Sequence, residues 1–126
     1  MDSQVYIIDD EPVVRKSMVA LISSIGIKTT AYSTAAEFLD VFVDGEPARQ
    51  CVIVDLRMPD MDGIQLKREL VARGDNVPVV LLTGYCTANT EEQAKEAGVF
   101  DILEKPCRPD ALKALIDKAF DSITPV

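Results

Sequence analysis

Five side chains that could take part in metal or phosphoryl chemistry each stand at the end of a short apolar run. They are Asp9, Asp10, Asp55, Thr83 and Lys105. Carboxylates crowded together repel one another, and Mg²⁺, which prefers oxygen ligands, relieves that repulsion. A carboxylate can also attack phosphorus, and the transferred group then needs positive charge and a hydrogen bond. The five residues therefore predict Mg²⁺-dependent transfer of a phosphoryl group to an aspartate, provided that the fold brings them together.

Alternating strands and helices are expected to position these five side chains. Short β-rich runs predict strands, and apolar residues at helical spacing predict helices. Strands are expected at residues 5–8, 28–32, 51–54, 78–82 and 100–103, each followed by a helix. This order indicates an α/β fold, a (βα)5 doubly wound sheet of five parallel strands. The more polar run at 28–32 suits an edge strand.

The five candidate side chains lie at or just beyond the carboxyl ends of four of these strands. Open parallel sheets bind ligands at that edge, at the point where the strand order reverses. The candidates are distant from one another in sequence, yet we expect them to converge in one crevice.

Size and charge narrow the function further. The chain has 126 residues and a net charge of −8, which suits one domain with its own core. We expect that domain to span residues 1–123, with 124–126 as its C-terminal end or the start of a linker. An acidic surface repels nucleic acid and anionic membranes, so neither is expected to bind this domain directly.

Several residue types are absent or sparse, and this excludes whole classes of site. The sequence contains no histidine, which excludes a Ser-His-Asp triad and a histidine-based zinc site. Cys51, Cys86 and Cys107 are widely spaced and odd in number, so neither a disulfide framework nor a CxxC metal site is expected. Neither a signal peptide nor an apolar run of membrane-spanning length is visible, and the cytoplasm is the expected location.

Four segments at the predicted strand ends resemble the receiver domains of response regulators, the CheY-like superfamily. The segments are residues 8–11, 54–63, 82–84 and 104–106, and they are most similar to the nitrogen-fixation type of transcription regulator. The resemblance covers essentially the whole chain and implies the flavodoxin-like strand order 2-1-3-4-5. It also implies a phosphorylation-activated receiver of a two-component system. Such a domain is a signalling phosphoacceptor and not an enzyme, because it catalyses only its own phosphorylation and dephosphorylation.

The resemblance also gives each candidate a role toward the phosphoryl group. Asp55 would be the phosphoacceptor, Lys105 would pair with the phosphoryl group, and Thr83 would donate a hydrogen bond to it. Pro106 matches a proline that usually follows a cis peptide bond. The phosphoryl donor would be a sensor histidine kinase.

The metal ligands implied by the resemblance come from two of the segments. Asp10 and Asp55 would bind Mg²⁺ directly, together with the main-chain carbonyl of Arg57. Asp9 would act mainly through water bound to the metal.

A partner surface is expected around the fourth predicted helix. That helix has only alanines as apolar anchors, and burying alanine contributes less than burying leucine. We therefore expect it to shift on phosphorylation, so that the surface of the fourth helix, fifth strand and fifth helix changes toward a partner or a second copy in a homodimer. The output is expected to be transcriptional, through a DNA-binding domain that would follow the C-terminus.

Two rival functions share part of this residue pattern. An aspartyl-phosphate hydrolase would need an acid two residues after Asp55, where this chain has Arg57. A phosphorylation-independent pseudo-receiver is favoured only by Ile102, which stands where many receivers carry an aromatic switch residue. Phe100 is expected on the same strand face as Ile102 but at a different depth.

Each candidate also has a plain structural interpretation. Asp9 and Asp10 could cap a helix, Thr83 could be an ordinary strand residue, and Lys105 could be a solvated surface lysine. Asp60 and Asp62 fall at calcium-loop spacing, but Met58 at the first ligand position offers no oxygen, so turn formation is expected there. Only the combination of the five residues favours a functional site over these interpretations.

Overall fold

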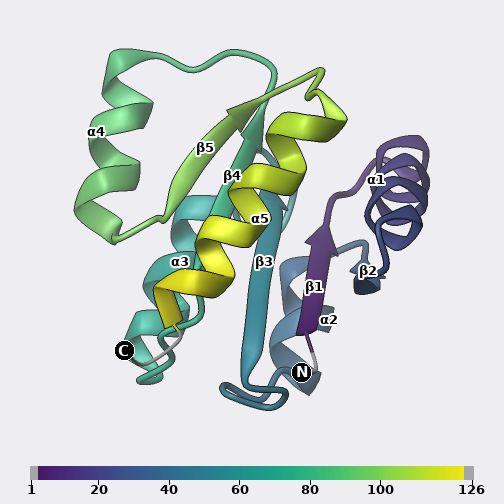
Figure 1. Ribbon diagram of the computed structural model, residues 1–126. Coiled ribbons are helices and arrows are strands. Elements are labelled where there is room, and N and C mark those ends of the chain that lie inside the picture. The colour runs from purple at the N-terminus through teal and green to yellow at the C-terminus, as the bar shows by residue number, and fades with distance from the viewer. Residues whose placement is uncertain (1–2, 124–126) are drawn as a thin grey trace.

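Five parallel strands form the centre of the structure, a computed structural model that describes residues 3–123. The strands are β1 (Ser3–Ile8), β2 (Lys28–Tyr32), β3 (Arg49–Asp55), β4 (Val79–Thr83) and β5 (Asp101–Glu104). Their order is β2-β1-β3-β4-β5 and every neighbouring pair is parallel, which confirms the predicted fold. The arrowheads of β1 and β5 point upward in Figure 1, and the residues discussed below lie at that edge of the sheet.

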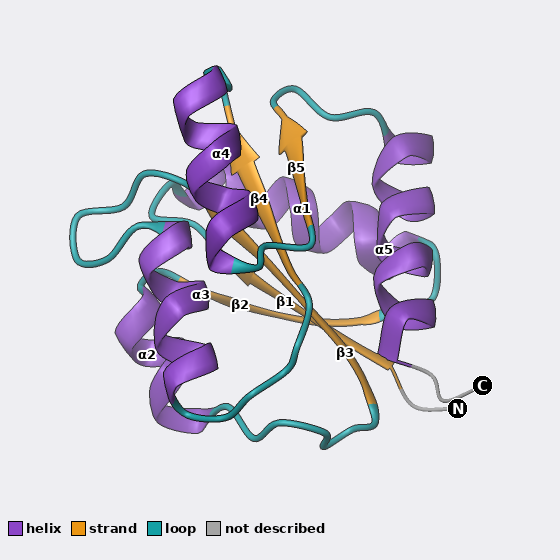
Figure 2. Ribbon diagram, turned by 90° about the vertical axis from the view of Figure 1, so that its left-hand side faces the viewer, coloured by secondary structure: helices purple, strands orange, loops and turns teal. Residues whose placement is uncertain are grey.

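Five helices cover both faces of the sheet (Figure 2). They are α1 (Pro12–Ser24), α2 (Ala35–Val41), α3 (Gly63–Ala72), α4 (Ala88–Ala97) and α5 (Pro109–Ile123). Met18 and Ile22 of α1 pack with Leu112 and Ile116 of α5 on one face. Side chains from α2, α3 and α4 pack on the other face. Because side chains alternate along the strands, the sheet contributes buried residues to the cores on both of its faces, as expected for a sheet covered on two sides.

The edges and ends of the elements follow local sequence signals. The polar strand β2 lies at one edge of the sheet, as predicted. The Thr34 hydroxyl accepts a hydrogen bond from the backbone N–H of Glu37 and so caps the start of α2. Gly98 ends α4 with a φ of 88°, a left-handed conformation that glycine adopts without steric cost.

A capping box formed by Asp62 and Gln65 begins α3, as is typical of a turn that leads into a helix. The Asp62 carboxylate accepts from the backbone N–H of Gln65, and the Gln65 side chain accepts from the backbone N–H of Asp62. Asp62 is therefore the N-cap residue of α3.

Residues 1–2 and 124–126 lie outside the described part of the chain, so the expected terminal segment or linker at 124–126 stays a prediction. Among residues 3–123, no helix is both long and apolar enough to cross a bilayer.

Candidate active site at the carboxyl edge of the sheet

A hollow of about 470 Å³ opens at the carboxyl edge of the sheet, as the strand ends predicted. It is lined by Asp10, Glu11, Asp55, Arg57, Thr83, Gly84, Tyr85 and Lys105. These residues lie at the ends of four different strands or just beyond them, and β1 and β3 lie side by side although β2 separates them in sequence. The parallel topology thus brings Asp10, Asp55 and Lys105 to a shared rim.

Asp9 is held both by its backbone and by its carboxylate. It is fully buried, and its backbone N–H donates to the Tyr32 carbonyl of β2 at 3.2 Å. The Arg15 guanidinium donates to the Asp9 carbonyl at 2.7 Å, while Asp9 Oδ1 accepts from the backbone N–H of Glu11 at 2.9 Å. The second carboxylate oxygen, Oδ2, faces the site and accepts a hydrogen bond from Lys105 Nζ at 3.3 Å.

Lys105 connects the two buried acids. Its Nζ lies 3.3 Å from Asp9 Oδ2 and 3.4 Å from Asp55 Oδ1. Burial alone would lower the pKa of the Lys105 ammonium, but the charges of Asp9 and Asp55 and their hydrogen bonds outweigh it and raise that pKa. The backbone N–H of Lys105 donates to the Thr83 carbonyl at 2.7 Å, and the bond to Pro106 is cis, as the resemblance implied.

Asp55 ends β3 and is nearly buried, with 7% of its surface exposed. Burial raises the pKa of its carboxyl, and the nearby charge of Asp9 raises it further, although Lys105 and the backbone N–H of Arg57 act in the opposite direction. The environment of Asp55 thus disfavours its negative charge as long as no further cation is present.

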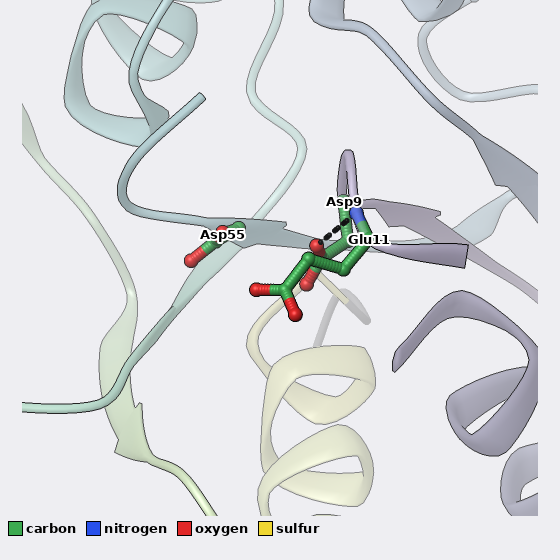
Figure 3. A group of neighbouring side chains, drawn as sticks. All are labelled: Asp9, Glu11 and Asp55. Atoms are coloured by element: carbon green, nitrogen blue, oxygen red, sulfur yellow. Dashed lines mark hydrogen bonds between the residues drawn. The ribbon is translucent and has the colours of Figure 1, made fainter. Parts of the chain in front are cut away.

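Three carboxylates come together at this rim. One oxygen each from Asp9, Glu11 and Asp55 lie within 4.8 Å of one another, and Figure 3 shows the three side chains. All the donors are oxygens, which fits a hard divalent cation such as Mg²⁺ and would not suit zinc.

Two placements at this rim differ from the roles that the resemblance implied. Asp10 is exposed and lines the hollow, but it is not a member of the three-carboxylate group. Glu11 is a member, and the sequence reasoning gave it no role. The alternation of side chains along β1 ends at Ile8. Residue spacing therefore does not predict which way the side chains of the following residues point. The available signal was Pro12, which starts α1 and sets the turn in which Glu11 lies.

Thr83 is buried at the end of β4, and its hydroxyl is engaged locally. Thr83 Oγ1 donates to the Tyr85 carbonyl at 3.0 Å and accepts from the Tyr85 backbone N–H at 3.2 Å. Thr83 lines the same hollow as Asp55, but its side chain is bound to the loop that leads to α4.

The expectation about Phe100 is wrong. Ile102 packs against the core on the side of α2, α3 and α4, whereas Phe100 packs against the core on the side of α1 and α5. Phe100 lies before β5 begins at Asp101, so strand alternation does not govern its direction. Phe100 therefore does not stand in for the missing aromatic residue beside Ile102.

Comparison with known proteins agrees with this geometry. The sequence profile of the response regulator receiver domain matches residues 5–117. The transcriptional regulatory protein FixJ of Azorhizobium caulinodans is 38% identical over 112 residues, which are 89% of this chain and 52% of that protein. The transcriptional regulatory protein TdiR of Thauera aromatica is 36% identical over 117 residues, 93% of this chain and 51% of that protein.

A solved structure shows the same arrangement. The crystal structure of FixJ-N superposes with a TM-score of 0.88 at 30% identity, covering 100% of this chain and 99% of that one. The chain spans about half the length of the curated relatives that it matches. With its sheet order, its acidic rim and a matching profile over nearly its whole length, this chain belongs to the response regulator receiver domain family, the signalling modules of two-component systems.

Proposed function

We propose that this chain accepts a phosphoryl group on Asp55 in a Mg²⁺-dependent reaction and thereby signals to an output domain. The observation that carries the proposal is the position of Lys105 Nζ, 3.3 Å from Asp9 and 3.4 Å from Asp55 at the rim of an open hollow. A fixed ammonium beside a nearly buried carboxylate supplies positive charge where a phosphoryl oxygen would arrive.

The proposed donor is the phosphohistidine of a sensor histidine kinase. A carboxylate oxygen of Asp55 attacks the phosphorus, the bond from phosphorus to the histidine nitrogen breaks, and the electron pair stays on the imidazole. Lys105 pairs with an equatorial phosphoryl oxygen, and Thr83 donates a hydrogen bond to another. Asp9, Asp10, Asp55 and the Arg57 carbonyl would hold Mg²⁺. When bound, the ion neutralises charge on the carboxylates and on the phosphoryl oxygens.

The proposed response follows from the bond between Thr83 and Tyr85. To reach a phosphoryl group on Asp55, the Thr83 hydroxyl must leave the Tyr85 carbonyl. The loop from Gly84 to Ala88 would follow, and α4 would shift because Ala94 is its one fully buried side chain. The surface formed by α4, β5 and α5 would then change toward a partner or a second copy of the chain.

The wider setting is also a proposal. The FixJ and TdiR relatives are named transcriptional regulatory proteins and are about twice as long as this chain. We therefore propose that residues 1–123 act as one receiver unit in the cytoplasm and control transcription through an output domain that binds DNA.

Phosphorylation of Asp55 can be tested with acetyl phosphate and Mg²⁺. The wild-type chain should incorporate one phosphate that is stable in acid and labile in base, and the Asp55→Asn variant should incorporate none. Asp60→Asn is the matched control, because Asp60 is exposed and caps α2 from the same β3–α3 loop without lining the hollow. Equal incorporation in wild type and Asp55→Asn would contradict the proposal.

The same experiment addresses the alternative suggested by Ile102. A phosphorylation-independent interaction module would take up no phosphate, although it would keep the fold. A hydrolase would release phosphate continuously from many donor molecules, but Arg57 is exposed at the position where such an enzyme needs an acid.

A further inference from the structure

The carboxylate of Glu11 lies beside the two buried acids of the site. Its oxygen is within 4.8 Å of oxygens of both Asp9 and Asp55, and Figure 3 shows the side chain reaching from beside Asp9 toward Asp55. Among the described residues, no other three acidic or sulfur side chains come this close together. Neither the strand-end pattern nor the family resemblance assigned Glu11 a role.

The backbone at the end of β1 explains this placement. The Glu11 backbone N–H donates to Asp9 Oδ1 at 2.9 Å, which closes a tight turn after the strand. Pro12 then begins α1 and fixes the direction in which the helix leaves. Within this turn Asp10 is exposed, and the Glu11 side chain returns over the end of the strand.

The Glu11 side chain is free to serve another partner. Glu11 is the N-cap residue of α1, but its side chain makes no cap hydrogen bond. Within residues 3–123, no lysine or arginine forms an ion pair with it. An exposed, flexible carboxylate beside two others is repelled by them unless a cation is also present.

The charges around the group indicate what that cation is. Asp9, Glu11 and Asp55 carry three negative charges when ionised, and Lys105 places one positive charge next to two of them. Asp10 lines the same hollow, so the rim keeps an excess of negative charge that a divalent cation would reduce. Oxygens on opposite sides of a bound Mg²⁺ are about 4 Å apart, so a small rotation of Glu11 brings its oxygen to the ion or to one of the waters that Mg²⁺ keeps.

We propose that Glu11 is a further ligand of the divalent cation at this site, bound directly or through one cation-bound water, and that it raises the affinity for Mg²⁺. This inference rests on the proposed function, because it concerns the cation that supports phosphorylation of Asp55. It adds a ligand to the set that the resemblance implied. Because the Glu11 side chain is exposed, replacing it leaves the core and the hydrogen bond from its backbone N–H to Asp9 in place.

Calorimetric titration of the 126-residue chain with Mg²⁺ tests the proposal. Glu11→Gln removes the charge at constant size, and Glu11→Asp keeps the charge but shortens the side chain by one methylene. Both variants should bind Mg²⁺ roughly tenfold more weakly than the wild type, the usual scale for a supporting group at a metal site. The control Glu96→Gln removes the same charge from the exposed face of α4 and should change the affinity by less than about twofold.

Comparing the Mg²⁺ affinities of the two Glu11 variants distinguishes a cation ligand from a charge that acts at a distance. Wild-type affinity in Glu11→Asp together with weakened binding in Glu11→Gln would mean that only net charge matters, which would overturn the proposal. Equal affinities of Glu11→Gln and Glu96→Gln would overturn it as well. The proposed function fails on a different result, the absence of phosphate incorporation in the wild type at saturating Mg²⁺, so the two failures can be told apart.

Discussion

The hydroxyl of Thr83 is bonded to both backbone polar groups of Tyr85, donating to the carbonyl at 3.0 Å and accepting from the N–H at 3.2 Å. This pair holds the beginning of the β4–α4 loop against the end of β4. Thr83 lines the same hollow as Asp55, so the hydroxyl has two competing acceptors once a phosphoryl group arrives. The loop therefore rests in one arrangement that phosphorylation would have to break.

Thr83→Ala should uncouple the loop from Asp55 without preventing phosphorylation. Removing the hydroxyl should lower the free energy of unfolding by about 1 kcal/mol, the net value of an ordinary hydrogen bond. In hydrogen exchange with and without beryllofluoride, the wild type should change protection over residues 84–98, and Thr83→Ala should show no change. Thr83→Ser retains the hydroxyl and is the control. A wild-type response in Thr83→Ala would show that the loop moves for another reason.

Asp55→Asn should stabilise the fold when Mg²⁺ is absent. Burial and the charge of Asp9 raise the pKa of the Asp55 carboxyl, so the folded state holds its proton more tightly than the unfolded chain does. Stability therefore falls as the pH rises from the ordinary aspartate pKa of about 3.9 through the raised value. The asparagine variant lacks this loss and should be more stable than the wild type at pH 7. Urea unfolding at pH 4 and pH 7 measures it, and added Mg²⁺ should reverse the order in favour of the wild type.

Lys105→Met should destabilise the fold at neutral pH, because it leaves Asp9 and Asp55 beside each other without their shared cation. The loss should be about 1–2 kcal/mol, less than for a fully buried pair, since part of the Lys105 side chain meets water. The pKa of Lys105 is raised, so its stabilisation is complete below about pH 10 and disappears as the pH rises through the raised value.

The matched control for Lys105 is Lys113→Met. Lys113 pairs with Asp117 at 3.0 Å on the exposed surface of α5, and losing that pair should cost less than about 0.5 kcal/mol. Adding Asp55→Asn to Lys105→Met should recover more stability than the same substitution adds to the wild type. An additive double variant would contradict the coupling of Lys105 and Asp55.

Gly63→Ala should disturb the packing between the start of α3 and the end of β3. A Cβ at Gly63 would stand 2.5 Å from Cδ2 of Leu81 and 3.1 Å from the backbone oxygen of Asp55. Such overpacking typically costs about 1–3 kcal/mol. It should also slow phosphorylation by acetyl phosphate, since α3 begins against Asp55, the proposed phosphoacceptor.

Gly84→Ala is the control for Gly63, because a Cβ at Gly84 meets no atom within 4 Å and its φ is not left-handed. Thermal unfolding compares the two variants directly. Equal melting temperatures would show that the start of α3 adjusts freely and does not press on Asp55.

Much of this molecule follows from local sequence. Apolar runs ending at Asp9, Asp55, Thr83 and Lys105 predicted which strands exist and which side chains end at their carboxyl edge. That prediction succeeds because the topology of a parallel sheet sends every strand end to the same edge, whatever lies between the strands. Helix ends also depend on local sequence, because caps such as Thr34 and Gly98 act on their own helix.

Other features depend on contacts between residues that are distant in sequence, and residue spacing does not predict these contacts. Gln50 is buried on β3, where its amide donates to the Tyr6 hydroxyl and to carbonyls of the loop after α2. Lys67 is buried as well, with its ammonium donating to the Val77 carbonyl. A polar side chain in a predicted core position reveals its partner only when distant segments are placed in space.

Residue type and spacing were enough to predict the order of the strands and helices along the chain and the residue types gathered at one edge of the sheet. The contacts of the folded chain were needed to show that Glu11 joins Asp9 and Asp55, that Thr83 is bonded to Tyr85, and that Phe100 and Ile102 pack on opposite sides of the sheet. The physical reason is that strand alternation fixes side-chain direction only inside a strand. Beyond a strand's ends, direction depends on the turn that the rest of the fold imposes.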